Sequence, residues 1–348
     1  MTTLGPVTEP HHFDEARLAN YLADQGFVDF QRDLKVLQYQ GGQSNPTYRL
    51  EAGGRYYVLR KKPPGDLLPS AHLVEREYRV MKALYDTDVP VPQVLHLCRD
   101  EDVIEQTFFL MEHVNGYVPT GPGLPEVSSC KERGIIYDAM NDALARLHSI
   151  DWEAVGLTDY GKPADYVARQ VARWTQQYEA TKHRSIPAMD ALIEWLPSHL
   201  PADDETSIAH GDYRLDNMIF QTEKPRVLAI VDWELSTLGH PLADLAYNCM
   251  AYHLPEGPLW KGLGAMDCAE FGIPSEEEYV TAYCRRTGRD GVSNWEFFLA
   301  FGLFRLASIC QGVYARVLEG NASSKNALEV GGKAPMLADA GWKLAQRA

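Results

Sequence analysis

One stretch of the sequence decides the fold, and it reads Ile208-Ala-His-Gly-Asp-Tyr-Arg-Leu-Asp-Asn-Met-Ile-Phe220, followed by Val227-Leu-Ala-Ile-Val-Asp-Trp-Glu234. Its two apolar runs, Met218–Phe220 and Val227–Val231, are separated by a polar loop, which predicts a β-hairpin. Asn217 stands directly before the first run and Asp232 directly after the second. We therefore expect the hairpin to bring these two side chains to one point.

The polar residues of this stretch fit the needs of phosphoryl transfer. That reaction requires one carboxylate to orient and deprotonate the attacking hydroxyl, and two hard oxygen ligands to hold Mg²⁺ against the phosphates. Asp212 precedes Asn217 by five residues, which is the spacing of the H-R-D-x-x-x-x-N catalytic loop. Asp232 ends an apolar run, as the metal-binding Asp of D-F-G does. Singly, each of the three is an ordinary turn residue; the joint pattern with His210 favours a kinase.

These motifs resemble the aminoglycoside phosphotransferase and choline kinase superfamily, whose loop reads H-G-D-x-x-x-x-N and whose metal motif reads D-x-E/D. The resemblance is strongest to the kinase-like domain found alone in bacteria or fused to certain eukaryotic acyl-CoA dehydrogenases. It covers roughly residues 30–320. The matching segments, in order, are GGQSNPTYRL (41–50), YVLRKKPPG (57–65), EREYRV (75–80), HGDYRLDN (210–217) and DWELSTLGHPLADLA (232–246).

The resemblance implies roles for single residues. Asp212 is then the catalytic base, and Asn217 and Asp232 hold magnesium, so that ATP and Mg²⁺ are the expected cofactors. His210 packs under the loop. Arg214 stands where protein kinases place a Lys, and it is expected to contact the γ-phosphate as a bidentate donor.

The expected fold class is α+β, a protein-kinase-like two-lobed fold. Its N-lobe is a small antiparallel β-sheet with one helix, and its C-lobe is larger and mainly helical. The expected division is an N-terminal extension at 1–29, a nucleotide-binding N-lobe at 30–114, and a C-lobe at 115–348 that carries the catalytic loop at 208–234 and the substrate-binding helices.

Local patterns place the elements. Strands are expected at Lys35–Tyr39, Thr47–Glu51, Arg55–Arg60, Val94–Cys98 and Thr107–Glu112, with a tight hairpin at Ala52-Gly53-Gly54. Helices are expected from Ser70 to about Tyr85, from 131 through Ile136, Met140, Ala143 and Leu147, over 163–200 with breaks at Pro187 and Pro197, over 276–288, and over 294–319 closed by Gly320.

The segment between the first two expected strands is the candidate phosphate-covering loop. Gly41 and Gly42 allow the backbone to approach phosphate oxygens, and Ser44 or Asn45 adds donors. The segment is not the G-x-G-x-x-G of protein kinases, and an ordinary turn is the alternative interpretation.

The strand 55–60 ends in basic residues. Kinases place a small apolar residue over adenine and a Lys two positions later on the same face, which fits Val58 and Arg60. Arg at that position departs from the pattern, because Arg is a rigid fork and Lys a point charge. Lys62 shares the face and is the alternative. For the partner carboxylate on the following helix, Glu77 is preferred over Glu75, since Glu77 lies at the rim of the apolar stripe.

Phe108–Gly116 resembles the kinase hinge. Met111 then takes the gatekeeper place, and the carbonyl of Glu112 and the amide of Val114 meet adenine. The alternative, a buried strand entering a turn, is compatible with this.

The acceptor is expected to be a hydroxyl of a small molecule. Asp244 follows Asp232 by only twelve positions, and by the resemblance it starts a helix that braces the catalytic loop. Little room therefore remains for a peptide platform. The acceptor pocket is expected between the loop, the segment 151–200 and the helices of 245–320. The family allows aminoglycosides, choline-like amines, sugars or hydroxyacyl thioesters, and the closest resemblance favours a hydroxyacyl group. A nucleotide-binding pseudokinase scaffold, which Arg60 favours, and a protein kinase are the alternatives.

Composition limits the partners. The 348 residues carry a net charge of −15, which argues against nucleic-acid binding. Six scattered cysteines indicate free, mostly buried thiols in a reducing compartment. The N-terminus lacks a secretory signal, and no run approaches about 18 apolar residues, so no membrane partner and a cytoplasmic location are expected. The oligomeric state is left open.

Overall fold

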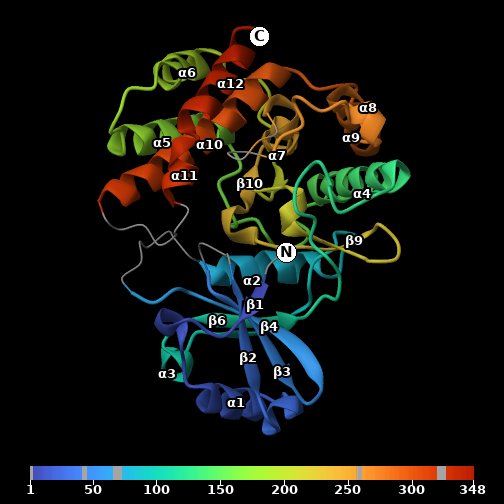
Figure 1. Cartoon of the computed structure of the whole chain (residues 1–348), viewed down its shortest axis with the longest axis vertical. Helices are drawn as coiled ribbons and strands as arrows, with labels where there is room; N and C mark the ends of the chain where they lie inside the picture. The colour runs from blue at the N-terminus through green and yellow to red at the C-terminus, as the bar shows by residue number, and fades with distance from the viewer. Residues whose placement is uncertain (1–2, 41–44, 66–72, 256, 258–260, 320–326) are drawn as a thin grey trace. The chain divides into compact units, whose positions relative to one another are not determined.

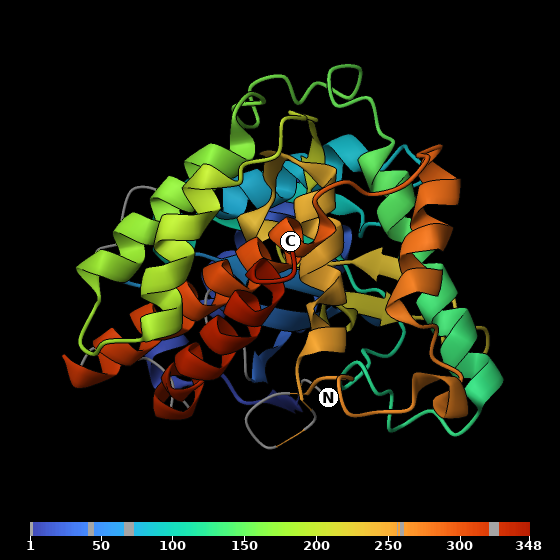
Figure 2. The ribbon, with the colours of Figure 1, turned by 90° about the horizontal axis from the view of Figure 1, so that it is seen from above.

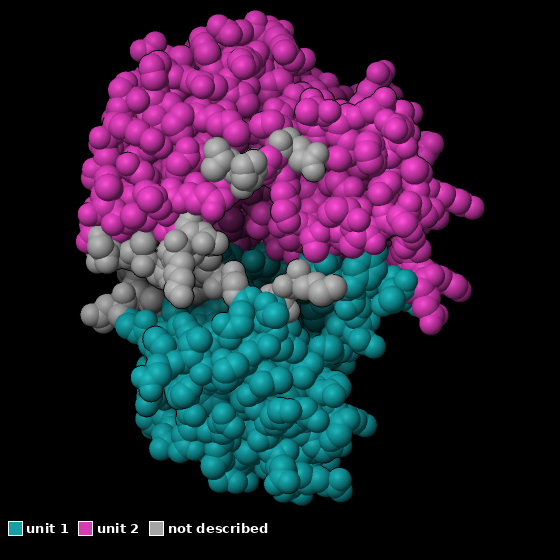
Figure 3. All heavy atoms as spheres, in the orientation of Figure 1, with its two compact units in different colours: residues 1–118, 218–222, 228–234 teal, residues 119–217, 223–227, 235–348 magenta. Residues whose placement is uncertain are grey.

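A computed structural model describes residues 3–40, 45–65, 73–255, 257, 261–319 and 327–348. The chain divides into two compact units, which Figure 3 colours separately. Unit 1 comprises Met1–Val118, Met218–Thr222 and Leu228–Glu234; unit 2 comprises Pro119–Asn217, Glu223–Val227 and Leu235–Ala348. The division at residues 29 and 114 stays a prediction.

Unit 1 is built on a six-stranded antiparallel sheet in the order β1-β2-β3-β4-β6-β5 (Figure 1). The strands are β1 (Thr3–Gly5), β2 (Lys35–Gln40), β3 (Thr47–Ala52), β4 (Arg55–Lys61), β5 (Val94–Cys98) and β6 (Phe108–Glu112). The helical elements are η1 (Glu9–His11), α1 (Glu15–Asp24), η2 (Val28–Gln31), α2 (Val74–Leu84) and α3 (Glu101–Ile104). The predicted strands are therefore present, with ends shifted by one residue or none.

The β3–β4 hairpin forms where the two glycines predict it. Gly53 and Gly54 have φ of 58° and 79°, a left-handed conformation that a residue with a Cβ adopts at a cost. In the hairpin, Val58 of β4 is the cross-strand partner of Arg49 in β3. The other edge of β4 pairs with β6.

The described residues of the N-terminal extension, 3–29, contribute to the core of unit 1. Asp14 caps α1 by accepting a hydrogen bond from the amide of Arg17, and Leu18 and Leu22, one turn apart, are fully buried. They pack in one apolar cluster with Tyr48 of β3 and other sheet residues. A strand and a helix thus form in a segment for which the sequence analysis expected neither.

Helix α2 begins later than predicted. It starts at Val74, and Leu73 precedes it without a side-chain cap. Ser70, the predicted cap, lies outside the described residues. The helix buries Val80, Met81 and Glu77 on one face, so a carboxylate is directed into the apolar side of the helix.

The predicted hairpin of the deciding stretch is present as β8 (Met218–Phe220) and β9 (Val227–Ile230), followed by the short turn η4 (Trp233–Leu235). Phe220 also bridges to Tyr117. A Cβ on Gly116 would lie 2.4 Å from the carbonyl oxygen of Phe220, so only glycine permits this approach. Asp232 has φ of 66°, an uncommon conformation for a residue with a side chain.

Unit 2 is mainly helical. Its helical elements are α4 (Cys130–His148), α5 (Tyr166–Ala180), α6 (Pro187–Ser198), η3 (Leu215–Asn217), α7 (Pro241–Cys249), η5 (Met250–His253), α8 (Cys268–Phe271), α9 (Glu276–Thr287), α10 (Trp295–Leu318), α11 (Ala327–Gly332) and α12 (Ala334–Ala345). The antiparallel pair β7 (Ser207–Ala209) and β10 (Thr237–Gly239) flanks the deciding stretch. The four apolar residues that predicted α4 are all buried.

Helix α10 is the centre of unit 2 and packs against α5, α6, α7, α11 and α12 (Figures 1 and 2). Within the described residues it is also the one helix long and apolar enough to cross a membrane, although the sequence analysis expected no such run. Of its most apolar window, 83% is buried inside the protein. Its composition is therefore explained by its place in the core. Gly320, predicted to close it, lies outside the described residues.

All six cysteines are free. Cys98, Cys249, Cys284 and Cys310 are buried, whereas Cys130 is exposed and Cys268 is half-buried. This agrees with the expectation of free, mostly buried thiols.

Candidate functional site

The catalytic loop, residues 210–217, is held by a buried carboxylate on α7. Asp244 accepts hydrogen bonds from the backbone amides of His210 and Gly211, at 2.6 and 2.9 Å. Burial opposes its charge, but the hydrogen bond and charge of His148 and the charge and amide of His210 outweigh it and hold the pKa of Asp244 below its usual value. Asp244 therefore lies in a helix and braces the loop, as the resemblance implied.

His210 is buried against the catalytic loop and holds its backbone. Its ring is fully buried, its Nδ1 accepts a hydrogen bond from the amide of Asp212 at 3.2 Å, and it packs edge-on against Tyr213. The imidazole therefore fixes the backbone that presents Asp212.

The carboxylate of Asp212 is fixed at both oxygens. Asn217 donates from Nδ2 to Oδ2 at 2.9 Å and to the carbonyl oxygen of Asp212 at 2.8 Å. The hydroxyl of Tyr247, on α7, donates to Oδ1 at 2.6 Å. Arg214 approaches with Nε at 3.3 Å and also pairs with Asp216 at 3.3 Å. The structure thus brings three of the predicted residues, at positions 212, 214 and 217, together in unit 2.

A second group of charges lies in unit 1, here called the arginine cluster. Its members are Asn45, Arg60, Glu77, Asp232 and Glu234. Arg60 donates to Glu77 at 3.0 Å and to Asp232 at 2.6 Å, and lies 3.8 Å from Glu234. Asn45 donates to Glu77 at 2.9 Å and to Glu234 at 3.4 Å. Four predicted residues, at positions 45, 60, 77 and 232, therefore meet in this cluster.

The ionisation of the cluster follows from its burial. Burial lowers the pKa of Arg60, but the surrounding carboxylates outweigh this and raise it. Burial raises the pKa of Glu77 to about 7, with Asp232 and Glu234 acting in the same direction and Arg60 against them. One guanidinium thus neutralises part of the charge of three carboxylates.

The two alternatives left open on β4 have different partners. Lys62 pairs with Glu75 at 2.6 Å, whereas Arg60 pairs with Glu77. Lys61 lies on the opposite face, with its ammonium 5.5 Å from the ring centroid of Phe13. Arg60 and Glu77 are therefore the pair that reaches Asp232.

The expected adenine contacts lie on neighbouring strands of unit 1. Val58 is the cross-strand partner of Met111, and both are buried. The amide and side chain of Glu112 are bonded to Gln93, and Val114 is half-buried just beyond β6. Gly41, Gly42 and Ser44 of the predicted phosphate loop lie outside the described residues.

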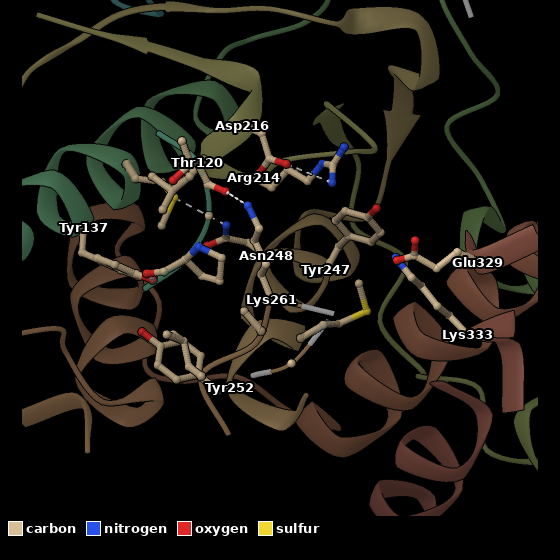
Figure 4. A pocket seen from close by; sticks show the side chains of 18 residues that line it. Thr120, Tyr137, Arg214, Asp216, Tyr247, Asn248, Tyr252, Lys261, Glu329 and Lys333 are labelled. Atoms are coloured by element: carbon tan, nitrogen blue, oxygen red, sulfur yellow. Dashed lines mark hydrogen bonds and ion pairs between the residues drawn. The ribbon is translucent and has the colours of Figure 1, made fainter. Parts of the chain in front are cut away.

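Unit 2 contains a cavity of about 490 Å³ beside the catalytic loop (Figure 4). Its size falls within the range of small-molecule sites. The ionisable cations and carboxylates that line it are Arg214, Lys261, Lys333, Asp216 and Glu329, and Lys261 donates to the carbonyl oxygen of Thr120 at 2.6 Å. Tyr247, Asn248 and Tyr252 form much of its wall.

One expectation about this region needs correction, namely that the segment 151–200 forms part of the acceptor pocket. No described residue from 151–200 lines the cavity. Four aromatic residues of that segment, Tyr160, Tyr166, Trp174 and Tyr178, are buried in the core instead.

Sequence reasoning missed the hydrogen bond from Tyr247 and the buried cation of Arg305. Arg305, on α10, donates to the carbonyl oxygen of Gly211 at 2.7 Å. The local signal for Tyr247 was its position three residues after Asp244, which puts both on one face of α7. Arg305 had no local signal, because its contact depends on how α10 packs.

Comparison with known proteins agrees with this geometry. Residues 35–292 match the family model described as "Phosphotransferase enzyme family". The chain is 50% identical over 343 residues to acyl-CoA dehydrogenase family member 10 of Mus musculus, covering 98% of this chain and 32% of the relative. It is 45% identical to family member 11 of Rattus norvegicus, covering 98% of this chain and 44% of the relative. The chain thus spans less than half the length of these relatives.

Solved structures give the fold. A protein of Ralstonia eutropha JMP134 assigned to the aminoglycoside phosphotransferases is 47% identical, with a TM-score of 0.87 over 97% of this chain and 99% of that one. A thermostable mutant of aminoglycoside phosphotransferase APH(4)-Ia, in ternary complex with ADP and hygromycin B, is 14% identical, with a TM-score of 0.60 over 94% and 98%.

The family match extends over most of the chain, and the predicted family and α+β kinase-like fold are confirmed. This protein is a member of the phosphotransferase enzyme family, with the kinase-type fold of the aminoglycoside phosphotransferases.

Proposed function

We propose that this protein transfers the γ-phosphate of ATP to a hydroxyl of a small molecule, with Asp212 as the base. The observation that carries the proposal is the position of Asp212. Its carboxylate is bonded by Asn217 and by Tyr247, and Tyr247 lines the cavity. A base bonded by a residue that lines a cavity of substrate size suits this reaction.

The transfer assigns one task to each loop residue. The acceptor hydroxyl donates its proton to Asp212 as its oxygen attacks the γ-phosphorus, and the bond to the β-phosphate oxygen breaks. Arg214, half-exposed beside Asp212, is proposed to contact the phosphate oxygens as a charged donor. Most of the rate enhancement then comes from positioning and charge, because the protein forms no covalent bond.

The arginine cluster is proposed to hold the nucleotide phosphates. Arg60 is oriented by Glu77 and has the fork geometry that suits phosphate. ADP and AMP-PNP occur in complexes of the structural neighbours, which supports ATP. The further residues proposed to contact the nucleotide are Gly41, Gly42, Ser44, Asn45, Val58, Met111, Glu112 and Val114.

Magnesium is proposed to bind at Asn217 and Asp232. Asn217 uses its amide nitrogen on Asp212, which leaves its oxygen as a ligand, and the contact of Asp232 to Arg60 uses one carboxylate oxygen. Amide and carboxylate oxygens suit Mg²⁺, which takes its other ligands from phosphate and water. No group of three or more metal-binding side chains occurs among the described residues, so the nucleotide is expected to complete the site. When bound, the ion neutralises charge on the phosphates.

The acceptor is proposed to carry a hydroxyacyl group. The cavity is lined by three cations and two carboxylates, a balance that favours an acceptor with anionic groups over a polycationic aminoglycoside. The curated relatives, which continue beyond the matched region, are named for acyl-CoA dehydrogenases. A thioester would carry the acyl chain that such enzymes oxidise.

The test is ATP consumption over pooled hydroxyacyl-CoAs, amines and sugars, with wild type and Asp212→Asn in parallel. We expect turnover with the hydroxyacyl pool, dependence on Mg²⁺, and a phosphate ester identified by mass spectrometry. Turnover with amines or sugars alone would reject the hydroxyacyl acceptor but keep the kinase. No turnover with any pool would reject the kinase.

A nucleotide-binding scaffold without catalysis is the second candidate. The observation that favours it is the bond of 2.6 Å from Arg60 to Asp232, which is a proposed magnesium ligand. The scaffold predicts a rise in melting temperature with Mg·ATP that no acceptor converts into turnover.

A further inference from the structure

Helix α7 holds four successive residues of the catalytic loop. Asp244 binds the amides at positions 210 and 211, Tyr247 binds the side chain of Asp212, and Asn248 donates to the carbonyl oxygen of Tyr213 at 3.2 Å. The three helix residues lie at i, i+3 and i+4, which puts them on one face. One face of α7 therefore bonds four consecutive residues of the loop.

The two oxygens of Asp212 are held from different sides. Oδ2 accepts from Asn217, whereas Oδ1 accepts from Tyr247, and of these two donors only Tyr247 lines the cavity (Figure 4). Arg214 also lines the cavity, but its Nε lies 3.3 Å from either oxygen, so the short bond from the cavity wall is the one from Tyr247 to Oδ1, at 2.6 Å. The phenol is therefore the cavity-lining group that holds Asp212 most closely.

The ring of Tyr247 is itself fixed. The guanidinium of Arg305 lies 5.4 Å from its centroid and donates to the carbonyl oxygen of Gly211. A Cβ on Gly302 would lie 3.0 Å from Sδ of Met250 and 3.8 Å from Cα of Tyr247, so the glycine lets α7 approach α10 closely. Burial, together with the charge of Asp212, raises the pKa of the Tyr247 hydroxyl, which therefore stays a proton donor.

We propose that Tyr247 is a positioning residue for phosphate transfer: its hydroxyl fixes the rotation of the Asp212 carboxylate so that one oxygen faces the acceptor. This role rests on the proposed function. Without the phenol, the terminal torsion of Asp212 would be restrained from the Oδ2 side alone, by Asn217 and Arg214, and sp³–sp² torsions are otherwise broad. A base that is free to rotate spends less time in the reactive geometry.

The test compares Tyr247→Phe with wild type, using Mg·ATP with 3-hydroxybutyryl-CoA, and with water as the acceptor in slow ATP hydrolysis. We expect kcat to fall about 10- to 100-fold, while the KM for ATP changes less than about twofold. The phenylalanine ring keeps its place over Arg305. The matched control is Tyr48→Phe, which removes a buried hydroxyl bonded to the carbonyl oxygen of His11 in unit 1 and should leave kcat unchanged.

The double variant Asp212→Asn/Tyr247→Phe separates positioning from a general structural effect. If Tyr247 acts through Asp212, the second change adds no further loss of kcat. Additive losses, a kcat equal to that of wild type, or a rise in acceptor KM alone would each overturn the proposal. If wild type itself turns over neither acceptor, the proposed function fails first, and this role fails with it.

Discussion

The arginine cluster of unit 1 and the catalytic loop of unit 2 are held by different forces. In the cluster, one guanidinium contacts three carboxylates, and charge is the main interaction. In the loop, the amides, the Asn217 side chain and the Tyr247 phenol are neutral donors to fixed acceptors. The cluster therefore responds to ions and pH, whereas the loop is set by geometry.

This difference matches the two tasks proposed for the regions. Three carboxylates around one guanidinium leave an excess of negative charge, which favours binding of a divalent cation. A base, in contrast, must be in place before the acceptor arrives, and hydrogen bonds from a buried helix achieve this without depending on the ligand. Perturbing each region should therefore change different measured quantities.

The largest expected effect is on the loop side. Asp212→Asn removes the base but keeps the shape of the side chain, so we expect kcat to fall about 10³-fold. Because Asp212 is not among the residues proposed to hold the nucleotide or Mg²⁺, the Kd of Mg·ATP should change less than about twofold. Isothermal titration and steady-state rates measure the two quantities. Loss of nucleotide binding together with kcat would show that the regions are not separable.

The next effect concerns the brace of the loop. Asp244→Ala leaves the buried amides of His210 and Gly211 without their acceptor, which should lower the free energy of unfolding by about 2–5 kcal/mol. Urea denaturation measures this. The control, Asp190→Ala, breaks an exposed pair with Lys182 and should cost far less stability than Asp244→Ala. Equal losses in the two variants would contradict a special role for Asp244.

Much of unit 1 could be predicted, because β2 and β3 alternate in burial and two glycines mark the turn after β3. Glu77 was preferred over Glu75 from its angle on the helix, and it is the carboxylate that meets Arg60. Helix α1, near the N-terminus, was not predicted, although Asp14 precedes Leu18 and Leu22 at helical spacing. A helix this short is stabilised mainly by its packing on the sheet, which the local sequence does not reveal.

Less of unit 2 could be predicted beyond its helices. The catalytic loop was found because its residues are close in sequence, but Tyr247 and Arg305 reach it through packing of α7 and α10. The cavity depends on η5 and α11, for which no element was expected. Local patterns thus locate the loop proposed to carry the chemistry better than the cavity beside it.

A smaller effect tests the choice between Arg60 and Lys62. Arg60→Lys replaces two directed donors of a planar fork, which bond Glu77 and Asp232, with a single point charge, so we expect the KM for ATP to rise about tenfold. Lys62→Met, which removes only the pair with Glu75, should change it less than about twofold. Steady-state kinetics at saturating acceptor measures both. The opposite ranking would assign the phosphate contact to Lys62.

The smallest expected effect is the pH dependence of the arginine cluster. With its pKa raised from 4.5 to about 7, folded Glu77 keeps a proton that the unfolded chain releases, so stability falls as pH rises through this window, by about 1 kcal/mol per unit. Asp244, whose pKa is lowered from 3.8, loses stability only in more acidic solution. Urea denaturation at pH 5 to 8 gives the free energy of unfolding of wild type and of Glu77→Gln. Plotted against pH, the two should diverge below pH 7. If they stay parallel, Arg60 keeps Glu77 ionised throughout.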